Sequence, residues 1–326
     1  MTRTTRRHAL ATGAAAVAAL AVPSLHAQAW PSRPIRLIVP FPPGGLIDRM
    51  ARLMAPRLSR ELGGATLVID NKPGVGGNLG AAEAARAAAD GYTLLMASPP
   101  LSISPAIYAK LPYPPEKIAP IGVVGKVPNV LLVNPKSGIN SVADLLARAK
   151  AEPGRMNYAS NGNGTSLHLS AELLKVSANV FITHIPYRGA AAAVTALMAG
   201  EVDTMFENLP SVLGQIRSGN VRALAVTTRT RSKALPQVPT MIESGLAGFD
   251  VGSWFGLAAP AGLPAAIATR LEGALQAVTR DTEIAATMEA SGAAVGFLDA
   301  RAAAAFMAAD TANWRKVAAF AKISVG

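Results

Sequence analysis

The stretch IRLIVPFPPGGLIDRMARLM, residues 35–54, joins two structural patterns. Its first five residues are mostly apolar and β-branched, which is typical of a buried strand. A proline- and glycine-rich break follows at residues 40–45. Apolar residues then recur three or four positions apart, at 47, 50, 51 and 54, which is the spacing of one face of a helix. The stretch therefore predicts a strand, a turn and a helix, the repeating unit of an α/β fold.

The same alternation continues along the chain. Further strands are expected at residues 66–69, 92–96, 130–133, 157–159, 182–186, 202–206, 221–227 and 254–260. Helices are expected at residues 81–89, 141–150, 190–199 and 211–218. Because the strand runs are apolar without alternation, they predict a parallel sheet that is covered on both faces. Residues 99–120 are rich in proline and are predicted to be irregular, and residues 264–322 are predicted to be purely helical.

Two of the expected strands suggest how the chain divides into domains. The strands at residues 130–133 and 254–259 bracket a self-contained set of strand and helix units. We therefore predict a discontinuous two-domain chain. Residues 30–129 and 251–326 would form one α/β lobe, and residues 130–250 the other, with the two strands as hinges.

The N-terminus has the pattern of an export signal. Three arginines, at residues 3, 6 and 7, precede an apolar run at residues 9–22 that is too short to span a bilayer. The small residues at 27–29 suit a signal peptidase, so cleavage is expected before Trp30. Thr5 to Leu10 also resemble a twin-arginine signal. We predict a periplasmic protein, and no later apolar run approaches the roughly 20 residues of a membrane span.

Composition narrows the possible partners. The formal net charge is +11, of which three units come from the leader, and the remaining basic residues are scattered rather than clustered. We therefore expect no nucleic-acid site. The chain has no cysteine, which excludes disulfides and thiolate metal sites. Only His168 and His184 follow the leader, and no carboxylate cluster stands out, so we expect no metal site. We also expect no cofactor and a monomeric protein.

A second glycine-rich turn lies in NYASNGNGTSLHLSAELL, residues 157–174. Gly162 and Gly164 let the main chain approach a ligand closely, just before a helix whose first amides are unpaired. Thr165 and Ser166 can donate hydroxyl hydrogen bonds. We favour an anion-binding site here, and the alternative is ordinary capping of the helix by Thr165 or Ser166.

Other turns fit the same pattern. Gly44 and Gly45 open the first helix, where Asp48 would either stabilise the helix dipole, fix the loop or meet a ligand ammonium group. The glycines at residues 74–80 lack the spacing of a dinucleotide site and are interpreted as turn and close-packing residues. Arg188 opens the helix at residues 190–199 and is either a ligand contact or simply solvated.

The polar residues beside these turns are a weaker indication of a binding site. Asn208 ends another expected strand, at the edge of the sheet where these turns lie, and its amide can both donate and accept hydrogen bonds. The neighbouring Glu207 would repel an anion. His184 is interpreted as a core residue. His168 is either a ligand contact or a packing residue.

Seven motifs, in this order and spacing, make the chain resemble a known family. They are VPFPPGGLIDRMAR, DNKPGVGGNLGA, ADGYTLL, YASNGNGTSLHLSAELL, HIPYRGAAAAVTALMAGEVDTMFENLP, VRALAVTT and SWFGLAAPAG. Together they cover essentially the whole mature chain and resemble the Bug/TctC family, the periplasmic receptors of tripartite tricarboxylate transporters. The resemblance implies a type II periplasmic-binding fold, whose two lobes close over a carboxylate that main-chain amides and hydroxyls hold.

The resemblance also implies a set of ligand-binding residues. These are Phe41, Gly44, Gly45, Asp48, Ser98, Ser160, Asn161, Gly162, Asn163, Gly164, Thr165, His168, Tyr187, Arg188 and Asn208. Residues 98–102 and Glu207 depart from the family pattern, where a more polar turn and an aspartate are usual. Both departures concern the distal end of the ligand.

The resemblance predicts a receptor rather than an enzyme, which delivers a small carboxylate to the membrane subunits of a transporter. A periplasmic sensor with the same binding site is an alternative. A periplasmic hydrolase is a second alternative, and it would need Ser160 or Ser166 as nucleophile with His168 as base.

Overall fold

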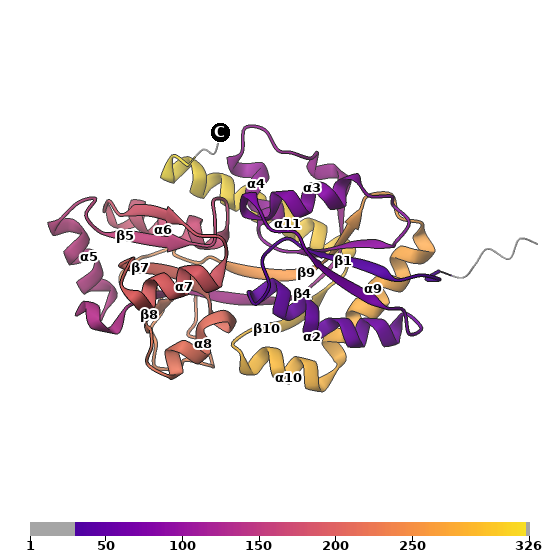
Figure 1. Ribbon diagram of the computed structural model, residues 1–326. Coiled ribbons are helices and arrows are strands. Elements are labelled where there is room, and N and C mark those ends of the chain that lie inside the picture. The colour runs from indigo at the N-terminus through magenta and orange to yellow at the C-terminus, as the bar shows by residue number, and fades with distance from the viewer. Residues whose placement is uncertain (1–29, 324–326) are drawn as a thin grey trace, which may run out of the picture.

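The computed structural model describes residues 30–323, so the predicted leader lies outside the described residues. Figure 1 shows two groups of helices and strands side by side, joined by long strands that run through both. The first group contains β1 (Ile35–Val39), α2 (Leu46–Glu61), β2 (Leu67–Asn71), α3 (Asn78–Arg86), β3 (Thr93–Ala97), α9 (Ala265–Arg280), α10 (Thr282–Ala290) and β10 (Ala294–Leu298). The second contains α5 (Val142–Ala151), β5 (Asn157–Ser160), α6 (Ser166–Ala178), β6 (Thr183–Pro186), α7 (Ala190–Ala199), β7 (Thr204–Asn208), α8 (Leu209–Arg217) and β8 (Arg222–Val226).

Two long strands connect the groups. β4 (Ile118–Val133) pairs with β9 (Gly252–Pro260) along residues 118–128 and then with β7 along residues 129–133. The path through the sheet is β2-β1-β3-β9-β4-β7-β5-β6, and β8 and β10 also pair with β4. The partners of β4 thus change between Pro128 and Asn129. The predicted domain boundaries lie close to this change, and they stay a prediction.

The sheet is mixed, so the prediction of a parallel sheet is wrong in part. β1 pairs in parallel with β2 and β3, and β5 with β6 and β7, as the strand–helix alternation predicts. β4 and β9 instead run antiparallel to their neighbours. The reason is that these two strands cross between the groups and are not joined to their neighbours by a covering helix.

Two segments differ from the sequence prediction. Residues 99–120 are irregular only in part, because α4 (Pro100–Ile107) lies there and β4 already begins at Ile118, whereas residues 109–114 form no helix or strand. Pro100 stands in the first turn of α4, where the missing N–H would be unpaired in any case, and Ile103 and Ile107 are buried. The C-terminal segment is not purely helical, because β10 pairs antiparallel with β4 between α10 and α11 (Ala300–Ala321).

The hydrophobic core links the two groups. One cluster lies between β1, β3, β9 and the helices α2 and α9, and includes Leu37, Met54 and Phe255. Another fills the second group around Tyr158 and Phe206, and Ile103 of α4 and Trp314 of α11 pack into it. α4 and α11 therefore contribute to the core of a group that lies mostly between residues 130 and 250. Within residues 30–323, none of the helices has the length and hydrophobicity needed to cross a bilayer.

Helix α5 begins at the predicted cap. Ser141 accepts a hydrogen bond from the main-chain N of Asp144 at 3.0 Å. Replacing this cap (Ser141→Ala) is expected to lower the free energy of unfolding by about 1 kcal/mol, because one amide of the first turn loses its partner. The measurement is the urea midpoint followed by circular dichroism. Ser59→Ala, inside α2, is the control and should leave the midpoint unchanged or slightly raised, so equal losses in both variants would contradict the cap.

Candidate functional site

A cavity of about 70 Å³ lies where the loops of the two groups meet. Five strand-to-helix connections reach it, namely those that lead into α2, α4, α6, α7 and α8, together with Ser253 of β9. Its lining consists of Phe41, Pro42, Pro43, Gly45, Leu46, Ile47, Ser98, Pro99, Pro100, Asn161, Thr165, Ser166, Leu167, Arg188, Gly189, Ala190, Ala191, Asn208 and Ser253. Apolar side chains dominate this lining, and its only basic side chain is Arg188.

The backbone adds a positive potential to the cavity. Each of the five helices begins at the cavity wall, and the N-terminus of a helix carries roughly half a positive charge. α2 and α7 begin after Gly45 and Gly189, neither of which provides a side-chain cap. Their first amides are therefore free to donate to a ligand. This arrangement favours a small anion in the cavity.

Asp48 holds the first loop from behind. Its carboxylate is buried and accepts hydrogen bonds from the main-chain N of Gly44 at 2.9 Å, from Arg52 Nε and from Asn71 Nδ2 at 3.0 Å. Burial acts to raise the pKa of Asp48, but the hydrogen bonds from Arg52, Gly44 and Asn71 outweigh it, so the pKa lies below its ordinary value. Asn71 also donates to the carbonyl of Phe41 at 3.0 Å. Of the predicted roles of Asp48, fixing the loop is the one that these contacts show.

The second loop is capped and also lines the cavity. Thr165 Oγ1 accepts from the main-chain N of His168 at 3.3 Å and donates to the carbonyl of Gly162 at 2.9 Å. Ordinary capping by Thr165, one of the two readings of this loop, is therefore present. Thr165, Ser166 and Leu167 also line the cavity, so capping by Thr165 is compatible with an anion-binding site at this loop.

The two histidines lie behind that loop. The His168 ring stacks on His184 with 4.4 Å between centroids, and His184 stacks on Tyr158 at 4.7 Å. His184 Nε2 and Ser160 Oγ are 2.6 Å apart. His184 is only partly buried, on the edge strand β6, so its interpretation as a core residue is right only in part. His168 is buried and does not line the cavity.

Glu207 lies completely buried at the end of β7. Its Oε2 accepts from Asn161 Nδ2 at 2.9 Å, and its Oε1 accepts from the main-chain N of Asn208 at 2.8 Å and from Asn208 Nδ2 at 3.2 Å. Burial raises the pKa of Glu207 to about 7, and the bonds from Asn208 and Asn161 oppose this shift. The side chain thus joins two amides of the cavity wall without lining the cavity itself.

The structure divides the predicted ligand-binding residues into two sets. Phe41, Gly45, Ser98, Asn161, Thr165, Arg188 and Asn208 line the cavity. Gly44, Asp48, Ser160, Gly162, Asn163, Gly164, His168 and Tyr187 do not, and they lie behind or beside the lining loops. Sequence reasoning missed Ser253, Asn71, the prolines of the lining and the role of Glu207. The prolines at 42, 43, 99 and 100 lie in or beside the predicted loops. Ser253 opens the motif SWFGLAAPAG, but no pattern in the sequence marks it as a residue of the cavity.

The glycines at residues 74–80 pack closely, as predicted. A Cβ atom on Gly76 would lie 2.1 Å from the carbonyl oxygen of Asn163, and one on Gly80 would lie 2.9 Å from Cα of Pro40. Gly76 therefore brings the segment after β2 against the loop before α6. No group of three or more His, Asp or Glu residues that could hold a metal occurs between residues 30 and 323.

Residues 50–322 match the family model described as "Tripartite tricarboxylate transporter family receptor". Protein BugT of Bordetella pertussis is 39% identical over 305 residues, which are 93% of each chain. This chain belongs to that receptor family. The family predicted from the sequence motifs is confirmed.

Solved structures agree with this membership. An R. palustris protein solved with adipate is 36% identical and has a TM-score of 0.87, with 90% of this chain and 99% of that chain covered. The periplasmic binding protein BugD has a TM-score of 0.86 at 34% identity, over 90% of this chain and 99% of that chain. MatC from Rhodopseudomonas palustris, solved with malate, has a TM-score of 0.83 at 29% identity, over 88% of this chain and 99% of that chain. The predicted two-lobed periplasmic-binding fold is confirmed.

Proposed function

We propose that this receptor captures a small carboxylate in the periplasm by closure of two lobes and delivers it to the permease of a tripartite tricarboxylate transporter. The observation that carries the proposal is the convergence of five helix N-termini on one small cavity. The first amides of α2 and α7 have no side-chain cap and can donate to a carboxylate there, and each charge-assisted hydrogen bond contributes on the order of 1.5–3 kcal/mol. The adipate and malate in the two related structures support this ligand class.

Closure would bring together residues 30–129 with 251–326 and residues 130–250. Two contacts between these parts lie at or next to residues of the cavity lining. Arg49 Nη1 donates to the carbonyl of Pro210 at 3.5 Å, and a Cβ atom on Gly189 would lie 2.9 Å from the Pro42 ring. A ligand between the lobes would lose most of its water, which strengthens each hydrogen bond to it.

The hydrolase alternative has little support. Within residues 30–323, the serine–histidine hydrogen bond joins Ser160 to His184 rather than to His168, and neither residue of this pair lines the cavity. Ser166 instead contacts Ser253 Oγ at 2.7 Å. A sensor would use the same binding step as a transport receptor, so the two differ in their protein partner. Export through cleavage before Trp30 and a monomeric state remain part of the proposal.

Thermal-shift and calorimetric titration with dicarboxylates test the ligand class. A carboxylate present at about 100 times its Kd should stabilise the protein by about 2.7 kcal/mol, which is roughly 5 °C in Tm for a chain of this size. The matched diamides are the control and should produce no shift, because they carry no charge for the helix N-termini. Equal shifts with acids and diamides, or none with any carboxylate, would contradict the proposal, and a ligand recovered chemically altered would favour the hydrolase.

A further inference from the structure

Two amides of the cavity wall are held in one orientation by a single carboxylate. Asn161 and Asn208 both line the cavity, and both donate their Nδ2 to Glu207. An ionised carboxylate has no hydrogen to give and can only accept. The nitrogen end of each amide must therefore face Glu207.

The oxygen ends of the same amides are left without partners. Asn161 Oδ1 and Asn208 Oδ1 are both buried, and neither has a hydrogen-bond partner among the described residues. A buried acceptor without a partner costs about 1–3 kcal/mol. Two such acceptors on one cavity indicate that something bound in the cavity donates to them.

A chain of hydrogen bonds through three serines and one asparagine also leaves only acceptors on the cavity wall. Ser170 Oγ donates to the carbonyl of Ser166 at 2.8 Å, so it must accept from Asn129 Nδ2 at 3.0 Å. Asn129 Oδ1 is thereby turned to Ser253 Oγ, which donates to it at 3.2 Å. Since Ser253 has then used its hydrogen, Ser166 must donate to Ser253. Both serines line the cavity with lone pairs only.

The cavity thus offers donors and acceptors on different parts of its wall. The uncapped N-termini of α2 and α7 supply main-chain donors. The group formed by Asn161, Asn208, Ser166 and Ser253 supplies acceptors. A simple dicarboxylate satisfies the donors but offers no hydrogen to these acceptors.

We propose that the ligand is a carboxylate that also bears a hydroxyl or amine donor, that Asn161 Oδ1 and Asn208 Oδ1 accept from this group, and that Glu207 is the positioning residue that keeps both oxygens available. The inference rests on the proposed function, since it names the subclass of carboxylate that the same cavity takes.

Replacing Glu207 by a neutral glutamine would change which groups of the cavity wall donate hydrogen bonds and which accept them. In Glu207→Gln the side-chain oxygen can still accept from the main-chain N of Asn208. Its nitrogen, however, faces Asn161 and donates, which turns the oxygen of that amide away from the cavity and towards residue 207. The variant retains the shape of the site and loses an acceptor.

Calorimetric titration of ligand pairs with the same carbon skeleton tests the inference. The pairs are succinate with malate or aspartate, and glutarate with 2-hydroxyglutarate or glutamate. The titrations are run at about pH 8.5, where a carboxyl with a pKa of about 7 is ionised. The wild-type protein should bind a hydroxy or amino acid at least roughly tenfold more tightly than its parent diacid in at least one pair, a difference of about 1.4 kcal/mol.

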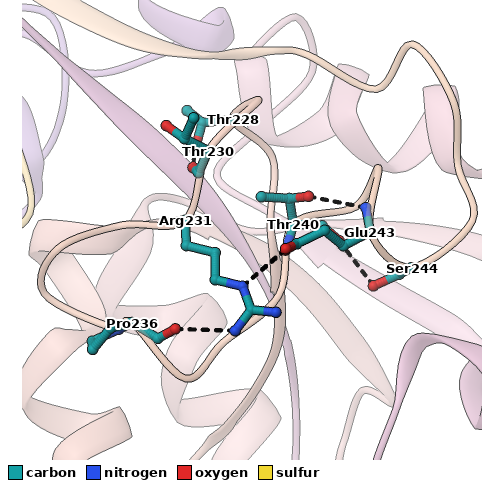
Figure 2. Close-up of polar contacts among 7 residues, drawn as sticks. All are labelled: Thr228, Thr230, Arg231, Pro236, Thr240, Glu243 and Ser244. Atoms are coloured by element: carbon teal, nitrogen blue, oxygen red, sulfur yellow. Dashed lines mark hydrogen bonds and ion pairs between the residues drawn. The ribbon is translucent and has the colours of Figure 1, made fainter.

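Two variants should reduce this preference to below roughly threefold, about 0.65 kcal/mol. They are Glu207→Gln and Asn161→Ala, and either one is sufficient if the other fails to fold. The ratio within a pair is the readout, because a purely structural defect weakens both ligands of a pair equally. Glu243→Gln is the matched control. Figure 2 shows Glu243 in the loop after β8 with its bonds to Arg231 and Thr240. Glu243 accepts from Arg231 Nε at 2.9 Å and from the main-chain N of Thr240 at 2.7 Å, and it is not among the residues that line the cavity.

Each outcome decides between the two proposals. Tight binding of the parent diacids without any preference would overturn the inference and leave the proposed function intact. A preference that survives both Glu207→Gln and Asn161→Ala would also overturn it. Failure of every carboxylate to bind would reject the proposed function, and the inference with it.

Discussion

Gly76→Ala is expected to weaken carboxylate binding by roughly thirtyfold, about 2 kcal/mol, because the added methyl group overpacks the contact between the lobes. The Cβ atom would lie 2.1 Å from the carbonyl oxygen of Asn163, where a main-chain atom cannot move without its loop. Gly76 belongs to the predicted first lobe and Asn163 to the second. The methyl group should therefore hold the lobes apart while each lobe remains folded. The measurement is Kd by calorimetry, with the far-UV spectrum as the check on folding.

The matched control separates this steric effect from backbone strain. Gly76 has a φ of +62°, and an alanine there costs about 1–2 kcal/mol through strain in either state of the protein. Gly219 has a φ of +74° and nothing within 4 Å of its added Cβ atom. Gly219→Ala should lower stability by a similar amount and leave Kd unchanged. Wild-type affinity in Gly76→Ala, or an equal loss in Gly219→Ala, would show that this contact does not limit closure.

Local sequence signals were sufficient for most of the elements. β1 lies at residues 35–39 and α7 at residues 190–199, as the apolar spacing and the flanking glycines predict. α5 begins directly after the predicted cap at Ser141. These elements are specified by residues within a few positions of one another, and such residues are visible in a single sequence.

The extent of β4 could not be predicted in this way. Its first half contains Pro120, Gly122 and Gly125, which usually interrupt a strand. In the structure these glycines are needed, because a Cβ atom on Gly122 would lie 2.7 Å from the carbonyl oxygen of Leu298, and one on Gly125 would lie 2.5 Å from the ring of Phe255. Both neighbours are more than 100 residues away along the chain. The same long-range pairing accounts for β10, which the helical composition of the C-terminal segment concealed.

The site was predictable to the level of its loops but not of its side chains. The glycine-rich turns before α2 and α6 were identified correctly as parts of one rim. The sequence does not tell which face of each turn is exposed, so His168 and Ser160 could not be distinguished from Thr165. The role of Glu207 depends on two amides that come from different loops. A repulsive carboxylate was expected at this position, and burial beneath Asn161 and Asn208 gives it a positioning role instead.

The buried imidazole of His168 should make the protein lose stability as the pH falls below about 6.5, whereas Glu207, whose pKa burial raises to about 7, contributes in the opposite direction in the wild-type protein and its variants alike. Burial lowers the pKa of His168 from 6.5 to about 4. Its Nδ1 accepts from the main-chain N of Gly164 at 3.3 Å, so a proton on Nδ1 would place two N–H groups opposite each other without an acceptor between them. The unfolded chain gains this proton as pH falls below about 6.5, whereas the folded protein does not until about pH 4. The contribution of His168 to the free energy of unfolding is therefore complete above pH 6.5 and is lost between pH 6.5 and pH 4, by about 3 kcal/mol in total.

The test compares urea midpoints of the wild-type protein and His168→Phe between pH 7 and pH 4.5. Phenylalanine preserves the stacking on His184 but does not titrate, so the variant should lose less stability on acidification, by about 1.4 kcal/mol per pH unit in the steepest part. Its loss of the acceptor for Gly164 is independent of pH and affects only the offset between the curves. Burial also lowers the pKa of His184, to about 3, so His168→Phe/His184→Phe should lose the least stability on acidification. The pKa values of Asp48, Asp281 and Glu243 lie below their ordinary values, which places their titration at the acid end of this interval or beyond it. Parallel curves for the wild-type protein and both variants would mean that the buried imidazoles do not account for the loss of stability in acid.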